Sequence, residues 1–229
     1  MVSYTRKVTV KLGGNLFPAP PNEKRIIECA RVIEQMAKTA KVLVVTGGGQ
    51  TARSYIHAVR QLGANESVCD QIGIEVSRLN AQLLISRLSQ VAMHEVPTSI
   101  KELKTLFREG NVVVMGGLTP GHSTTAVGAL GAEATGSDLY LIASDVDGIY
   151  SSDPKTDRTA RKLDRISTGE MLHLALSTKL FAGTYELDPL AVKVIERSRI
   201  RTIFLDGTKP QNIIKAFKGQ KIGTLIKAA

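Results

Sequence analysis

Short apolar runs recur along the chain and predict the strands of a sheet that is covered on both faces, since they do not alternate with polar residues. Five such runs are bounded by Gly, Asp or Asn, and they span residues 8–12, 42–46, 112–115, 139–144 and 202–205. Between them, apolar residues repeat at helical spacing over residues 23–37, 51–62, 73–88, 100–108, 124–134, 190–198 and 212–217. The spacing Ser99 to Glu102 and Ser167 to Glu170 is that of a capping box and marks helix starts.

Strand and helix alternate over the whole length, which predicts an α/β fold with a mainly parallel central sheet between helices, a three-layer α-β-α sandwich. We expect one domain over residues 1–229. Its soft boundary is the polar, basic stretch 153–165, which separates an N-terminal half of about 1–138 from a C-terminal half of about 139–229.

Composition places the chain among ordinary globular proteins. It has 229 residues, 43% of them hydrophobic, and a mean hydropathy of +0.01. No run reaches the length of a membrane span and the first residues lead into a strand, so we expect a cytoplasmic protein without a membrane partner. Cys29 and Cys69 lack metal-ligand spacing and are interpreted as ordinary reduced side chains.

The net charge of +9 raises the question of nucleic-acid binding. The basic residues are scattered, however, and only five Tyr, five Phe and no Trp are available to stack on bases. No nucleic-acid-binding motif is present. We therefore expect no nucleic-acid partner, and favour a basic surface that attracts small polyanions such as nucleotides.

Three of the predicted strands run into glycine clusters, at residues 13–14, 47–49 and 116–117. A turn without Cβ atoms lets backbone N–H groups approach an anion, and a helix that begins just after it adds the positive end of its dipole. One such turn would be weak evidence. Several, each after a buried strand, predict phosphate ligands that meet at one edge of the sheet.

The first two turns each carry a basic residue. Lys11 stands two residues before Gly13, which Gly14 and Asn15 follow, and the lysine could hold a phosphoryl group there; the alternative is a surface lysine before a turn. Arg53 falls about one helical turn after Gly49 and could reach back to an anion; the alternative is a tight strand–helix turn. The second turn is neither a Walker A loop nor a Rossmann fingerprint, because the required spacings are absent.

Polar residues at two further places suit an acceptor. Asp70 stands at the predicted start of a helix, where capping is the default role, although a carboxylate there could also bind ribose hydroxyls. The third turn continues through hydroxyl-bearing residues into the helix at Thr124 and suits a second phosphate-bearing ligand. His122 in this loop could act as a base, but an ordinary loop histidine is favoured.

The fourth strand is followed by three carboxylates and an aromatic residue within residues 145–153. Asp145, at the strand end, could orient lysines or a Mg²⁺-bound phosphate, and Tyr150 could line a base pocket. The alternative is an acidic turn in which Asp147 and Gly148 reverse the chain.

Taken in order, these segments resemble the amino acid kinase family, and within it the archaeal type of UMP kinase. The family pattern runs Lys-x-Gly-Gly, Gly-Gly-Gly, Gly-Gly with Pro-Gly-His and Thr, then Asp-Val-Asp-Gly-x-Tyr with Asp-Pro, and the chain meets it from Lys11 to Pro154. Residues 182–191, 196–198 and 223–226 also read like this subgroup, so the resemblance covers essentially the whole chain.

By position, the resemblance implies catalytic roles for Lys11 and Asp145. It implies ATP contacts at Gly14, Asn15, Gly49, Arg53, Ser144, Asp145, Tyr150 and Asp153. It implies UMP contacts at Gly48, Asp70, Leu118, Thr119, Pro120, Gly121, His122, Ser123 and Thr124. Two residues depart from the pattern: Asn15 stands where Ser is commoner, and Asp145 stands where many UMP kinases have Asn or Lys.

The activity implied is transfer of the ATP γ-phosphoryl group to UMP, with Mg²⁺ as cofactor, in pyrimidine nucleotide biosynthesis. The resemblance also implies a homohexamer, a trimer of dimers with the N-terminal half in the dimer contact. Two alternatives stay open: another small-acceptor kinase of the family, such as isopentenyl phosphate kinase, and a non-catalytic nucleotide- or oxyanion-binding protein on the same fold.

Overall fold

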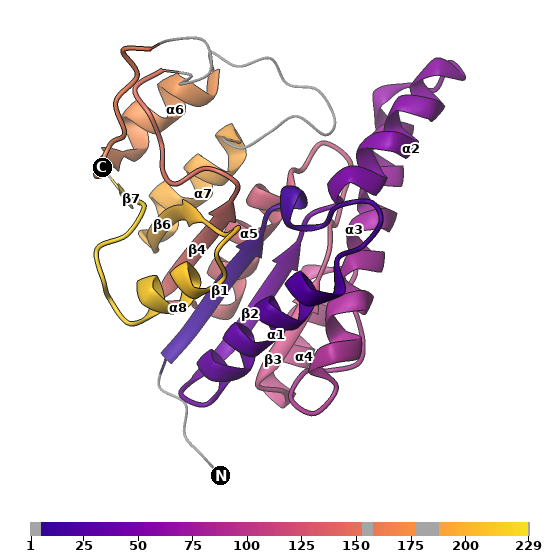
Figure 1. The fold of residues 1–229 in the computed structure, drawn as a ribbon, viewed down its shortest axis with the longest axis horizontal. Coiled ribbons are helices and arrows are strands. Elements are labelled where there is room, and N and C mark those ends of the chain that lie inside the picture. The colour runs from indigo at the N-terminus through magenta and orange to yellow at the C-terminus, as the bar shows by residue number, and fades with distance from the viewer. Residues whose placement is uncertain (1–5, 153–157, 177–187, 229) are drawn as a thin grey trace.

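The computed structural model describes residues 6–152, 158–176 and 188–228 (Figure 1). Its strands are β1 (Arg6–Leu12), β2 (Ala40–Thr46), β3 (Val112–Met115), β4 (Leu139–Ser144), β5 (Arg165–Ser167), β6 (Arg201–Asp206) and β7 (Thr224–Lys227). Its helices are the 3₁₀ turn η1 (Gly14–Leu16), α1 (Glu23–Ala37), α2 (Gly49–Gln61), α3 (Glu66–Leu88), α4 (Ile100–Glu109), α5 (Thr124–Thr135), α6 (Thr168–Leu176), α7 (Pro189–Ser198) and α8 (Gln211–Phe217).

The strands form one sheet in the order β3-β2-β1-β4-β6-β7-β5. The first five run parallel, and β7 pairs antiparallel with β6. The register pairs Leu12 with Thr46 on one side and with Ala143 on the other, and Met115 with Val45. The carboxyl ends of β1 to β4 therefore lie together at one edge of the sheet.

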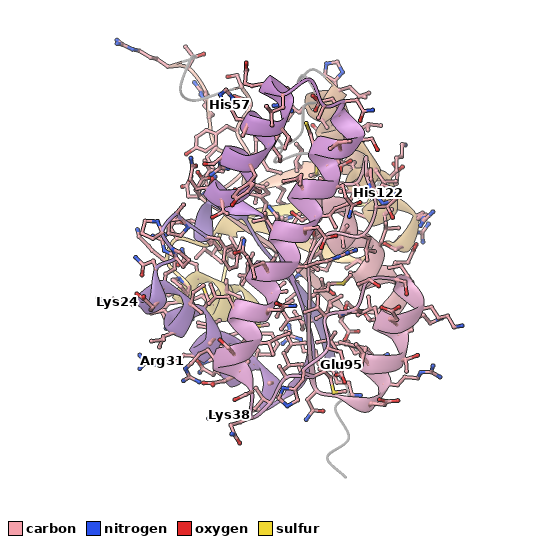
Figure 2. All side chains as sticks on the ribbon, turned by 90° about the vertical axis from the view of Figure 1, so that its right-hand side faces the viewer. Lys24, Arg31, Lys38, His57, Glu95 and His122 are labelled. Carbon is pink, nitrogen blue, oxygen red and sulfur yellow. The ribbon has the colours of Figure 1, made fainter. Side chains whose placement is uncertain are left out.

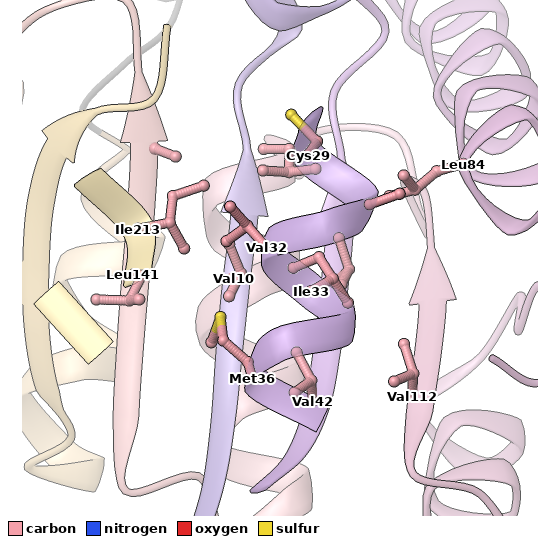
Figure 3. Packing of buried hydrophobic residues seen from close by; sticks show 14 of the residues in the cluster. Val10, Cys29, Val32, Ile33, Met36, Val42, Leu84, Val112, Leu141 and Ile213 are labelled. Carbon is pink, nitrogen blue, oxygen red and sulfur yellow. The ribbon is translucent and has the colours of Figure 1, made fainter. Parts of the chain in front are cut away.

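Helices cover both faces of the sheet. On one face, the core joins alternate residues of the central strands to α1, α3 and α8, and Figure 3 shows α1 packed over Val10 and Val42. On the other face, the intervening strand residues pack against α4, α5, α6 and α7. The predicted three-layer sandwich with a mainly parallel sheet is confirmed.

The predicted strands and helices all exist, with one boundary clearly wrong. The third helix was expected at residue 73, but α3 begins at Glu66 because the Asn65 side chain accepts a hydrogen bond from Val68 N (3.1 Å) and caps it. Strands β5 and β7 were not predicted, since each is too short to stand out from its surroundings. The capping box at Ser167 does start α6: Glu170 N donates to Ser167 Oγ (3.2 Å), and Ser167 N donates to Glu170 Oε2 (2.8 Å).

Within the described residues, no helix has both the length and the apolar character that a membrane span needs.

Helix α5 packs closely on the sheet through glycine. A Cβ atom on Gly128 would collide with the phenol of Tyr140, which is fully buried and donates a hydrogen bond to Thr125 O (2.8 Å). In α6, a Cβ on Gly169 would meet only Ser167 Oγ, at 3.9 Å.

We expect Gly128→Ala to lower the free energy of unfolding by up to about 2 kcal/mol, because an overpacking cost of about 1–3 kcal/mol outweighs the gain of about 1 kcal/mol in helix propensity. Gly169→Ala is the matched control, and we expect it to stabilise the protein by up to about 1 kcal/mol. Urea unfolding of both variants checks the pair. Equal effects of the two substitutions would contradict the packing argument.

Candidate active site

A cleft of about 250 Å³ opens at the carboxyl edge of the sheet, where the chain leaves β1 toward β2 on one side and later returns as β4 on the other. Such a change of direction is where open α/β sheets usually bind ligands. The cleft brings together most of the predicted site residues: Lys11, Gly14, Asn15, Gly48, Gly49, Arg53, Asp70, Gly121, His122, Ser123, Thr124 and Ser144.

The remaining predicted residues are placed differently. Leu118, Thr119, Pro120, Asp145 and Tyr150 are not among the residues that line this cleft. Asp145 is exposed just beyond β4 and accepts a hydrogen bond from Ser144 Oγ (3.3 Å). Asp153 lies outside the described residues.

The first two glycine turns pack backbone against backbone. A Cβ on Gly47 would lie 2.5 Å from Gly14 N, and one on Gly14 would lie 2.9 Å from Gly49 N. Gly49 also has a φ of +70°, which disfavours other residues. The glycines are therefore required by the contact between the turns, and that contact leaves Gly48 and Gly49 bordering the cleft.

Lys11 lies in the cleft because of the strand pleat. Val8, Val10 and Leu12 face the layer of α1 and α8, so Lys11 projects from the opposite face of β1, toward the side on which α5 begins. It is only 5% exposed, and its Nζ lies 3.5 Å from the position of a Cβ on Gly13. A lysine so placed carries a charge to the first glycine turn, as its sequence position predicts.

Arg53 connects the first two turns. Its Nη2 donates to Asn15 Oδ1 (2.7 Å) and its Nε to Gln50 Oε1 (3.2 Å). The departure from the family pattern at Asn15 thus has a physical role, because the amide oxygen accepts from the guanidinium. The guanidinium is thereby held beside the start of α2.

Asp70 is not a helix cap, so the default interpretation of it is wrong. It lies in the second turn of α3, and its Oδ2 accepts a hydrogen bond from Gly121 N (2.7 Å). Asp70 therefore ties α3 to the loop that follows the third glycine turn, and it lines the cleft.

Helix α3 also contributes side chains to the site that belong to none of the sequence motifs. Ser77 Oγ accepts from Gly117 N (2.7 Å), and Arg78 donates to Gly117 O (3.1 Å) and Leu118 O (3.4 Å). Asn80 Nδ2 donates to the carbonyls of Gly47 (2.7 Å) and Gly48 (3.1 Å). A signal was present, because Ser77 and Asn80 lie three residues apart on the otherwise apolar buried face of α3, and buried polar side chains need hydrogen-bond partners.

The loop over residues 118–123 ends at α5, where Ser123 Oγ accepts from Ala126 N (3.1 Å). Asp188 joins this end to α7, because its Oδ2 accepts from Ser123 N (3.3 Å) and its Oδ1 from Leu190 N (2.8 Å). His122 N donates to Thr119 O (3.2 Å), and its buried Nδ1 has no hydrogen-bond partner. Within the part of the chain that the structure describes, no carboxylate hydrogen-bonds to the imidazole, which favours an ordinary loop histidine.

The acidic segment after β4 pairs antiparallel with a later segment through Tyr150 and Lys162. Tyr150 Oη donates to Asp147 Oδ1 (2.8 Å), and Lys162 Nζ donates to Asp147 Oδ2 (3.1 Å). Burial alone would raise the pKa of Asp147, but these two donors outweigh it and lower the pKa below its usual value. The same hydrogen bond to Asp147 raises the pKa of Tyr150. The Asp147 side chain thus links the segment after β4 to Lys162.

Known proteins resemble this chain over most of its length. The sequence profile of the amino acid kinase family matches residues 6–206. The uridylate kinase of Archaeoglobus fulgidus is 46% identical over 222 residues, which cover 96% of this chain and 99% of that protein. The uridylate kinase of Methanococcoides burtonii is 42% identical over 218 residues, 95% of this chain and 93% of that protein. The chain belongs to the amino acid kinase family.

Solved structures support the same conclusion. The crystal structure of uridylate kinase from Archaeoglobus fulgidus superposes on this amino acid kinase with a TM-score of 0.86 at 44% identity, covering 96% of this chain and 99% of that one. The UMP kinase of Bacillus anthracis gives a TM-score of 0.81 at 21% identity, and here the likeness concerns the fold alone.

A metal ion bound to this amino acid kinase would be coordinated by few protein side chains. Among the residues that the structure describes, no three His, Cys, Asp or Glu side chains come together to hold an ion. Mg²⁺ commonly binds through one or two carboxylates together with substrate phosphates. Asp145, exposed at the carboxyl end of β4, suits that arrangement.

Proposed function

We propose that this amino acid kinase transfers the γ-phosphoryl group of ATP to UMP, giving ADP and UDP, as a step of pyrimidine nucleotide biosynthesis. The observation that carries the proposal is the meeting of three glycine turns, Lys11 and Asp70 around one cleft. The archaeal relatives named uridylate kinase, 38–46% identical over most of the chain, support UMP as the acceptor.

In this proposal the two nucleotides approach from opposite sides of the cleft. The C-terminal half, about 139–229, binds ATP through the segment after β4, together with the first glycine turn and Arg53. The N-terminal half, about 1–138, binds UMP through Gly48, Asp70 and the loop 118–124. One sheet runs through both halves, which supports treating residues 1–229 as a single domain.

The reaction asks for charge neutralisation and alignment rather than proton transfer, because the acceptor is already a phosphate oxygen anion. Lys11, held in the cleft with little exposure, lowers the energy of the negative charge that spreads over the transferred group. Mg²⁺, when bound with ATP, supplies further neutralisation. Asp145 would hold this ion or orient Lys11, and His122 has no part as a base.

Assembly forms a further part of the proposal: a homohexamer built as a trimer of dimers. Helix α3 carries a second apolar stripe besides its core face, in which Val68 and Leu79 are 46% and 58% exposed and Ile72, Val76 and Leu83 are partly buried. Figure 2 shows α2 and α3 along this side of the molecule. A stripe of this kind supports a dimer contact through the N-terminal half.

We expect Leu79→Asp to shift the assembly to smaller species, because a buried carboxylate would have no partner across the contact. Mass photometry of the purified protein measures this directly. Leu176→Asp, at another exposed leucine on α6, serves as the control and should leave the assembly intact. A hexamer that survives Leu79→Asp would place the dimer contact elsewhere.

The reaction itself is tested with Mg-ATP and a panel of UMP, CMP, dUMP, AMP, isopentenyl phosphate and acetylglutamate, by following ADP formation. Isopentenyl phosphate matters most as a competitor, because Ala52, Ile56 and Ile74 give the cleft an apolar wall. We expect turnover with UMP. Binding without turnover would favour a non-catalytic protein instead.

Asp70→Asn refines this test, since an asparagine Oδ1 can still accept the hydrogen bond from Gly121 N while the charge is lost. We expect kcat/KM for UMP to fall about 10- to 100-fold, the value of one or two hydrogen bonds to a charged group. Turnover of isopentenyl phosphate, if any, should change little. An unaltered kcat/KM for UMP would remove Asp70 from the ribose site.

Lys11→Ala should lower kcat about 10²- to 10³-fold, the usual loss when one preorganised charge donor is removed from a transition state. Steady-state kinetics at saturating ATP and UMP measure it. The exposed Lys24, labelled in Figure 2, gives the control variant Lys24→Ala, which we expect to behave as the unmodified protein. Near-normal turnover of Lys11→Ala would rule out Lys11 as the main electrostatic residue.

A further inference from the structure

Two side chains in the middle of α3 hold four backbone carbonyls of the glycine turns. Asn80 Nδ2 donates to Gly47 O (2.7 Å) and Gly48 O (3.1 Å). Arg78 donates through Nε to Gly117 O (3.1 Å) and through Nη2 to Leu118 O (3.4 Å). Asn80 and Arg78, which we call clamps, are largely buried: Asn80 is 9% exposed and the Arg78 side chain is 19% exposed.

A clamped carbonyl fixes the N–H group of the next residue. The peptide unit is planar, and in its trans form the C=O of one residue and the N–H of the next point in opposite directions. The only cis peptide among the described residues is Ala19–Pro20. Asn80 therefore turns the N–H groups of Gly48 and Gly49 away from α3, and Arg78 does the same for Leu118 and Thr119.

In the second glycine turn, the side that borders the cleft lies opposite the carbonyl groups that Asn80 holds. Gly48 and Gly49 line the cleft, and the missing Cβ of Gly14, which would lie 2.9 Å from Gly49 N, leaves that nitrogen uncovered. The third turn differs, because Gly117 N is already taken by Ser77 Oγ. The next N–H groups, those of Leu118 and Thr119, lie in the loop that leads to Gly121 in the cleft, and neither residue lines the cleft itself.

An external clamp is needed because of the glycines themselves. Glycine has access to φ values of both signs, so a turn of three glycines does not hold its peptide planes on its own. A pocket that binds anions through N–H groups depends on those groups being oriented before the ligand arrives. The side-chain amide of Asn80 supplies two donors to two neighbouring carbonyls and so fixes two peptide planes at once.

We propose that Asn80 and Arg78 are positioning residues. Asn80 orients the backbone N–H groups of Gly48 and Gly49 toward the bound phosphates, and Arg78 fixes the start of the loop that leads from Gly117 to Gly121 and His122 in the cleft. Asn80 acts on the second glycine turn, in which Gly48 is assigned to UMP and Gly49 to ATP. Arg78 acts only on the loop over residues 118–124, which is assigned to UMP and is called the acceptor loop below. The assignment of the phosphates to UMP and ATP rests on the proposed function.

The test uses the full chain with Asn80→Leu, which keeps the shape but lacks donors, and Asn80→Asp, which adds a charge. We expect Asn80→Leu to raise the KM for both UMP and ATP at least about tenfold, with a smaller loss in kcat, and to weaken UMP binding in calorimetry without ATP to a similar degree. The exposed Gln82 on the same helix provides matched controls, Gln82→Leu and Gln82→Glu, which should change neither constant.

Arg78→Lys keeps the charge but loses the planar fork, and it tests the acceptor loop even if Asn80→Leu does not fold. We expect a several-fold rise in the KM for UMP and an unchanged KM for ATP. Equal rises in both constants, or none, would overturn the role of Arg78.

A folded Asn80→Leu with UMP affinity within about twofold of the unmodified protein would overturn the role of Asn80. So would a loss seen in Asn80→Asp alone, which would show a charge effect. If the unmodified protein does not phosphorylate UMP, the proposed function fails separately. Calorimetry with inorganic phosphate then decides the positioning role, which predicts weaker phosphate binding in Asn80→Leu than in Gln82→Leu.

Discussion

The close contact between the first two glycine turns is the constraint on which the site depends. Gly13 N donates to Ala143 O (2.7 Å) and Gly47 N to Leu12 O (2.9 Å), so both turns extend the strand ladder beyond the last regular pairs. A Cβ at Gly14 or Gly47 would push the turns apart. The site is thus built from backbone brought close to backbone, and it places N–H groups where phosphate oxygens can reach them.

Helix α3 holds this arrangement from one side. Along its length, Asp70 holds Gly121, Ser77 and Arg78 hold the third turn, and Asn80 holds the second turn. The outward face of the same helix carries the apolar stripe around Leu79. A second copy seated on that stripe would also stiffen the helix that positions the acceptor loop, so assembly and catalysis share one structural element in this proposal.

The chemistry agrees with the absence of an activated nucleophile in the sequence motifs. Phosphoryl transfer between nucleotides needs positive charge and aligned donors, and the cleft offers a little-exposed lysine, a guanidinium held by Asn15, and oriented backbone N–H groups. Two carboxylates hold the loop that borders the cleft: Asp70 accepts a hydrogen bond from Gly121 N, and Asp188 accepts one from Ser123 N.

Much of the fold could be predicted from periodicity alone, because buried parallel strands and amphipathic helices are local patterns. The strands over residues 112–115 and 139–144 and the helix over residues 23–37 have the predicted ends. The short edge strand β5 and the early start of α3 could not be predicted so well. The first depends on pairing with β7, and the second on a single capping asparagine.

Local sequence patterns are enough to show which residues could handle phosphate, because the glycine clusters follow apolar runs directly and a lysine lies near the end of β1. What each of these residues contacts depends on the tertiary fold. Asp70 accepts a hydrogen bond from Gly121 N and does not cap a helix, and Asn15 accepts one from Arg53. Asn80 and Arg78 donate hydrogen bonds to the carbonyl groups of the glycine turns. These contacts join residues that are 32 to 51 positions apart in the chain, and no local sequence pattern records which of them will meet.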